Sequence, residues 1–163
     1  MKLKLPPDHA QVKCVDDAIK QGLEHPNAGL PDILVWVIES GTQFSAEGYQ
    51  HLVGDGGLRA RLVEFLDEAL IERDRFEEGF EVARHRVRAM RPDSSETEQA
   101  VTDFLRVGVC RAAAYVIVRL LEIAIENFDV DGPEAAMVSL GQAFAVAHAF
   151  PGAESFEATP TLH

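Results

Sequence analysis

Residues 58–90 read LRARLVEFLDEALIERDRFEEGFEVARHRVRAM, and this stretch decides the fold. Mainly apolar positions recur in it alternately four and three residues apart, with one polar interruption. A 3.5-residue period of this kind is typical of a long helix packed at a shallow angle against a second helix. Arg91 and Pro92 follow and end the pattern, which predicts a helix over about 57–91. The repeating positions are Leu62, Leu66, Ala69, Arg73, Phe76, Phe80, Ala83, Val87 and Met90.

A second long helix is predicted directly after this one. Residues 95–98 read SETE, a capping box, and the helical pattern then continues to about residue 128. Its second half is apolar on most sides, so we expect it to be the central helix of the fold. A short turn makes the two long helices antiparallel neighbours. The sequence therefore predicts an all-α fold, a single-domain helical bundle built on two long antiparallel helices (about 57–91 and 95–128) with shorter N- and C-terminal helices.

The N-terminal third contains shorter elements. Residues 2–5 alternate charge and leucine, which predicts a short extended arm, and Asp8 is expected to cap a helix after it. Residues 33–38 are all apolar, and their pattern fits either a buried strand or a buried helix. Pro31 just before them favours the helix. Ser45 is a candidate cap for a third short helix.

The C-terminal helix is expected to begin with a cap at Asp131 and to end near residue 150. Gly141 and Ala145 lie one turn apart in it, so a neighbouring backbone can approach closely there. We expect residues 1–152 to form one helical domain and residues 153–163 a polar tail.

Charge and cysteine content restrict the classes of function. Fifteen Lys and Arg stand against 27 Asp and Glu, a formal net charge of −12, so direct binding to nucleic acid or to an anionic membrane is not expected. The first residues lack the apolar region of a signal peptide, and uncharged apolar runs fall far below the ~20 residues of a membrane helix. Cys14 and Cys110 have no CxxC partner and are expected to be reduced structural thiols. We therefore expect a soluble, cytoplasmic protein.

The charges are unevenly distributed along the chain. Residues 93–163 hold eleven acids and three arginines, whereas residues 57–92 hold eight of each sign. Arg84, Arg88 and Arg91 share one helix face and are candidates for binding an acidic partner or phosphate. The explanation we favour for them is complementarity to the helix dipole together with pairing to preceding glutamates. In the tail, two acids, Glu154 and Glu157, are candidates for contact with a basic partner.

A polar stripe crosses the otherwise apolar half of the second long helix. Charged side chains on a mostly buried helix must pair, reach solvent or line a cleft. Arg119 and Glu122 are spaced to pair locally, and the alternative is a cleft that binds a small anionic ligand. The residues of the stripe are Arg111, Arg119, Glu122 and Glu126.

Two short acidic motifs suggest a metal site as an alternative. Residues 77–81 spell EExxE, and residues 126–129 spell ExxD on the other long helix. Carboxylates three or four residues apart share a helix face, and such sets hold Mg²⁺ against phosphates. Together the motifs resemble the magnesium-binding signature of the all-α nucleoside-triphosphate pyrophosphohydrolases. That resemblance implies Mg²⁺ ligands at Glu77, Glu78, Glu81, Glu126 and Asp129, whereas an ordinary solvated acidic face accounts for the same residues.

No constellation of catalytic residues or cofactor motif accompanies these features in the sequence. We therefore expect an acidic helical protein–protein interaction module: a non-catalytic adaptor, chaperone-like or inhibitor protein that requires no cofactor. Its partner is expected to be another protein, in particular a basic or nucleic-acid-binding one, and self-association is a further option. The alternatives are the magnesium-dependent pyrophosphohydrolase and a helical sensor of small ligands.

Overall fold

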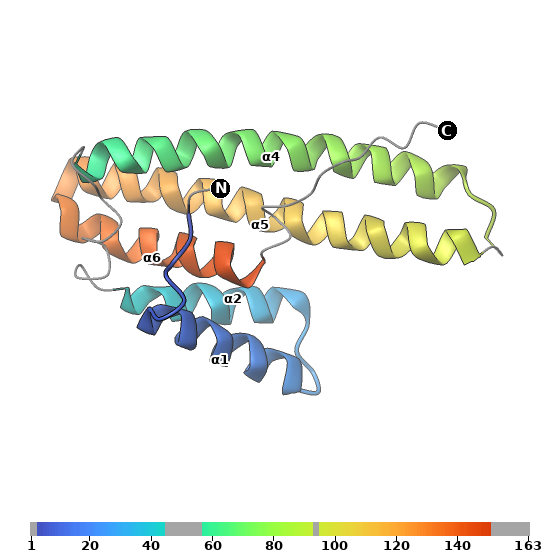
Figure 1. The fold of residues 1–163 in the computed structure, drawn as a ribbon, viewed down its shortest axis with the longest axis horizontal. Helices are drawn as coiled ribbons and strands as arrows, with labels where there is room; N and C mark the ends of the chain where they lie inside the picture. Colours follow the sequence, from blue (N-terminus) through green and yellow to red (C-terminus); the bar gives the residue numbers. More distant parts are fainter. Residues whose placement is uncertain (1–2, 45–56, 93–94, 151–163) are drawn as a thin grey trace.

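The computed structural model describes residues 3–44, 57–92 and 95–150. Two long helices, α4 and α5, lie antiparallel along the longest axis of the molecule (Figure 1). Helix α6 packs against α5, and α1 and α2 pack against α6 and against each other. The described residues thus form the predicted all-α bundle. The elements are α1 (Ala10–Glu24), α2 (Leu30–Ser40), the short 3₁₀ helix η1 (Gly41–Gln43), α4 (Leu58–Ala89), α5 (Ser95–Asp131) and α6 (Pro133–Ala149).

Two ion pairs fix the register between α4 and α5. Near the start of α4, the Arg59 guanidinium donates two hydrogen bonds to the Asp129 carboxylate, at 2.7 and 2.9 Å. Eighteen residues further along α4, Glu77 pairs with Arg111, which lies eighteen residues before Asp129 on α5. The two helices therefore keep one antiparallel register over the five turns between these pairs.

The main core lies where α6, α1 and α2 cover the long helices. It includes α4 up to Leu70 and α5 from Ala113 onward. Helix α6 is the most buried element: ten of its 17 residues are buried, and half of these ten are Ala or Gly. We expected α5 to be central, and α5 does lie between α4 and α6, but the small side chains of α6 let its neighbours enclose it more fully. We call this part of the molecule the body.

The predicted close approach at Gly141 is present. Carbonyl and Cα atoms of η1 and α6 meet there so closely that a Cβ on Gly141 would overlap the Cβ of Phe44, and one on Gly41 would overlap the backbone of Gln142. Beside this contact the Phe44 ring stacks on Phe144 with centroids 5.5 Å apart. Glycine at both positions therefore fixes the position of η1, and of α2 before it, on α6.

Beyond the body, α4 and α5 continue as a two-helix projection (Figure 1). We call residues 71–92 and 95–115 the projecting hairpin. Its interior is a separate small cluster of Phe76 and Cys110 with Ala114. Further out, the Phe80 and Phe104 rings stack with centroids 4.9 Å apart. Two helices alone cannot enclose these side chains fully, so Phe80 and Phe104 are only half-buried.

Several predicted boundaries hold and others differ. The apolar run 33–38 is helical within α2, as Pro31 indicated. The arm is present, with Leu3 and Leu5 buried in the main core. Helix α1 is capped by His9 and not by Asp8, because the His9 ring accepts a hydrogen bond from the Gln11 backbone N–H at 3.0 Å.

The end of α5 also differs from the prediction. Helix α5 runs to Asp131, three residues beyond the predicted end, and Gly132, at φ 89°, replaces Asp131 as the cap of α6. A positive φ is available to glycine at little cost, which lets two helices meet across one residue. Ser45 and the tail 153–163 lie outside the described residues, and the extent of the domain stays a prediction. Among the described helices, none has the length and hydrophobicity needed to span a bilayer.

Candidate interaction surface on the projecting hairpin

A polar cluster joins α4 to α5 at the base of the projecting hairpin. The Arg111 side chain of α5 donates two hydrogen bonds to the Glu77 carboxylate of α4, at 2.5 and 3.1 Å. The Tyr115 hydroxyl donates a third to the same carboxylate, at 3.1 Å. Like the Arg59–Asp129 pair, this ion pair is bidentate, and that geometry fixes the orientation of both side chains.

Aromatic rings surround the guanidinium of Arg111. Its central carbon lies 4.8 Å from the Phe80 ring centroid and 5.2 Å from that of Tyr115. The central guanidinium carbon of Arg73 also lies near the Tyr115 ring, 5.6 Å from its centroid. Cations stacked on aromatic faces at these distances stabilise each other's positions. The result is a continuous surface of alternating rings and arginines.

The contacts in this cluster favour the charged forms of both Glu77 and Arg111. The hydrogen bond from Arg111 is the largest effect on the pKa of Glu77 and lowers it below its usual value. Burial opposes this shift, and the hydrogen bond from Tyr115 adds to it. The Arg111 pKa is raised, chiefly by the hydrogen bond from its guanidinium to Glu77. Both groups are therefore ionised at neutral pH, so Glu77 holds Arg111 in place and does not exchange protons there.

The structure divides the polar stripe predicted on α5. Arg111 belongs to the interhelical cluster, whereas Arg119 pairs along its own helix with Glu122 at 3.1 Å and Glu126 at 3.4 Å. Arg119 is 59% exposed in side-chain area, so this end of the stripe lies in solvent. Local pairing, one of the two outcomes expected from the sequence, is the observed one.

The carboxylates of the two acidic motifs do not converge. Because of the antiparallel register, Asp129 lies beside Arg59 at one end of α4, eighteen residues from Glu77. At 1.5 Å per residue this places the motifs roughly 25 Å apart. Glu81 is bound to Arg84 and Glu126 to Arg119, while Glu78 is exposed. Among the described residues, no three His, Cys, Asp or Glu side chains form a group that could hold a metal ion.

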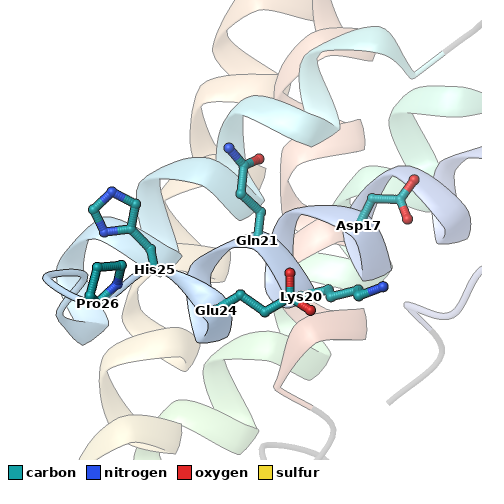
Figure 2. A pocket seen from close by; sticks show the side chains of 6 residues that line it. All are labelled: Asp17, Lys20, Gln21, Glu24, His25 and Pro26. Atoms are coloured by element: carbon teal, nitrogen blue, oxygen red, sulfur yellow. The ribbon is translucent and has the colours of Figure 1, made fainter.

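A shallow hollow of about 390 Å³ lies on the surface of the body, at the end of α1. Exposed residues at the end of α1 and in the loop after it line the hollow, and Figure 2 shows their side chains leaving the backbone in several directions. An open site without convergent polar groups does not match the enclosed, largely apolar pockets that hold small molecules. The lining residues are Asp17, Lys20, Gln21, Glu24, His25 and Pro26.

The predicted arginine face lies at the outer end of α4. Arg84 is bound to Glu81, whereas Arg88 and Arg91 are exposed and form no ion pair with any described residue. Arg84 follows Glu77 by seven residues and so lies on the same side of the hairpin as the polar cluster, whereas Arg91 lies two residues beyond the end of α4. Glu154 and Glu157 lie outside the described residues.

A second apolar pattern on α5, which the sequence reasoning missed, completes this side of the hairpin. We call it the outer stripe, and its members are alternately four and three residues apart. Leu105 is 60% exposed, Tyr115 43% and Val101 37%. The spacing itself was the available signal, but it becomes visible only once the face of α5 that packs on α4 is known. The outer stripe consists of Val101, Leu105, Gly108, Ala112 and Tyr115.

No family model, curated protein or solved structure matches the chain, so similarity to known proteins gives no information on its activity.

Proposed function

We propose that this protein is a non-catalytic protein–protein interaction module that makes contact through the outer stripe and the arginine face of its projecting hairpin. The observation that carries the proposal is the outer stripe: residues at a 3.5-residue period, of which Val101, Leu105, Ala112 and Tyr115 are exposed. Exposed apolar residues scattered singly are ordinary, but a heptad stripe is the pattern that a packed helix requires. The stripe therefore suits a helical partner.

The surroundings of the outer stripe support a contact role. Arg111, Arg73 and the rings of Phe80 and Tyr115 provide aromatic and arginine side chains, which are enriched where proteins bind each other. Their mutual stacking orders them before a partner arrives, which lowers the entropic cost of binding. An adaptor, chaperone-like or inhibitor role would use such a surface.

We further propose that the module works in the cytoplasm. Cys14 is exposed and Cys110 is buried, and both are free thiols. Burial raises the pKa of the Cys110 thiol, which keeps it protonated and unreactive. Free thiols suit a reducing compartment. The magnesium-dependent hydrolase is not carried forward, because its five proposed ligands lie at two separate places on the long helices.

Site-specific photo-crosslinking tests the contact surface. A photoreactive phenylalanine analogue replaces Leu105, and in a matched control it replaces Leu23, which is 74% exposed on α1. Irradiation in cells should produce discrete crosslinked species from position 105 and none of comparable yield from position 23. Equal yields at the two positions, or no crosslinks at 105, contradict the proposal.

A further inference from the structure

We infer that the surface covering the outer stripe is a second copy of this chain. In the proposed arrangement the two projecting hairpins dock face to face, with their tips at the same end. Each α4 then lies antiparallel to the α5 of the other copy, and the four helices form an antiparallel bundle. This inference rests on the proposed function, because it names the partner of the same surface.

The first argument is the number of helices that the apolar residues require. The projecting hairpin consists of two helices, so among the described residues only one side of α5 is covered there, by α4. Helix α5 nevertheless carries apolar residues at heptad spacing both toward α4 and on the outer stripe. A second hairpin supplies the two helices that turn such a pair into a four-helix core. Ala112, near the middle of the stripe, has a small side chain that lets a facing helix approach closely, whereas Gly108 lies against the Phe80 ring of α4.

The second argument is charge complementarity within the hairpin itself. Arg88 lies in the last turn of α4 and Arg91 two residues beyond its end, and the first turn of α5 carries Glu96 and Glu98. Exposure of all four leaves them available to a partner. In the proposed arrangement the basic end of each α4 meets the acidic start of the other copy's α5, so two equivalent attractive contacts form. A surface that is its own complement is what a two-fold dimer requires.

The third argument is the area available. About twenty residues per helix give a face roughly 30 Å long, and two neighbouring helices make it about 20 Å wide. A face of this size buries on the order of 600 Å² per copy, which is at the lower limit for a stable interface. The dimer should therefore be in equilibrium with monomer, with a dissociation constant in the micromolar range.

Light scattering coupled to size-exclusion chromatography tests the pairing with the full chain. The wild type should approach twice its monomer mass of 17.9 kDa as concentration rises. Leu105→Glu should weaken dimerisation at least about tenfold, whereas Leu23→Glu on α1 should leave it unchanged. Because both leucines are exposed, neither change should unfold the protein, and circular dichroism checks this. A wild type that stays monomeric, or a dimer insensitive to Leu105→Glu, overturns the inference.

A charge-reversal experiment tests the arrangement of the helices. One variant combines Arg88→Glu with Arg91→Glu, and a second combines Glu96→Arg with Glu98→Arg. Each alone places like charges at both contacts and should dimerise weakly, but an equimolar mixture restores attraction at both and should form a heterodimer. Failure of the mixture to recover the wild-type mass rules out the proposed pairing of α4 with α5.

The crosslinking and light-scattering experiments distinguish the two proposals. If position 105 crosslinks to a different protein and the purified chain stays monomeric, the second copy is wrong and the interaction module stands. If position 105 crosslinks to nothing, both proposals fail together. Crosslinks between two copies of the chain support both.

Discussion

The two halves of the α4–α5 pair have the same helical geometry but different surroundings. In the body, Ile117, Leu121 and Ala124 of α5 are at most 1% exposed because α6 covers them. Eighteen residues earlier, exactly five turns, the same face of α5 carries Gln99, Asp103 and Arg106. The polarity of this face therefore changes where α6 ends. The sequence of α5 thus matches two environments: a face covered by α6 in the body and the same face without α6 in the projecting hairpin.

The outer side of α5 changes in the opposite sense. In the body it carries the solvated Arg119 and Glu126, whereas on the projecting hairpin it carries Val101 and Leu105. In the body, apolar residues of α5 lie on the face that α6 covers. In the projecting hairpin, that face is polar, and apolar residues lie on the outer side, which no other described helix of the chain covers. This exchange distinguishes the projecting hairpin from a helix pair that simply overhangs its core.

The largest expected difference between the halves concerns stability. Leu121→Ala in the body should lower the free energy of unfolding by about 2–5 kcal/mol, because Leu121 is fully buried and its truncation leaves a cavity. Leu105→Ala on the outer stripe should change it by less than about 0.5 kcal/mol in dilute protein. Urea denaturation followed by circular dichroism measures both. Similar losses in the two variants would show that Leu105 is buried in the dilute protein and would contradict the open outer stripe.

A smaller effect is expected from adding one methyl group in each half. Gly141→Ala forces a Cβ into Phe44 and should destabilise the protein by roughly 1–3 kcal/mol. Gly108→Ala meets only the edge of the Phe80 ring, at 3.4 Å, so the gain in helix propensity should leave stability equal or slightly higher. Thermal unfolding of the dilute variants compares them. A stabilised Gly141→Ala variant would contradict the close approach of η1 to α6.

The smallest effect is expected at the junction of the halves and depends on pH. Glu77 has a pKa lowered below its ordinary value of 4.5, so the native state favours the carboxylate. This contribution to stability is present above about pH 4.5 and is lost as pH falls through the lowered pKa. Urea titrations between pH 6 and 3 should show a shallower acid loss in Glu77→Gln than in wild type. Glu78→Gln, a change at an exposed neighbour, is the control and should keep the wild-type slope.

The fold was accessible from the sequence because its strongest signals are local. The heptad positions Leu62, Ala69 and Phe76 predict a helix packed on a partner, and all three are buried against α5 and its neighbours. The continuation at Val87 and Met90 follows the same period but is only half-buried. Periodicity shows which side of a helix is packed, but it does not show how many neighbours cover that side.

The candidate site was accessible only in part. The sequence singled out Arg111 and Glu77 separately, one for a polar stripe and one for a metal motif, and the structure joins them as a pair. Their meeting depends on the register between α4 and α5, which no local pattern contains. The outer stripe was missed for the same reason. Only when Phe104 and Arg111 are known to face α4 does it become clear that the pattern from Val101 to Tyr115 lies on a different side of α5.

The constant register of α4 and α5 also makes the length of the hairpin adjustable. Adding one heptad to each helix would move the tip outward by about 10 Å while returning every face to its original side. Adding two residues to only one helix would instead rotate the contact residues beyond the insertion by about 200°, away from the other helix. The distance between the body and whatever the tip touches can therefore evolve in discrete steps, independently of the packing around α6.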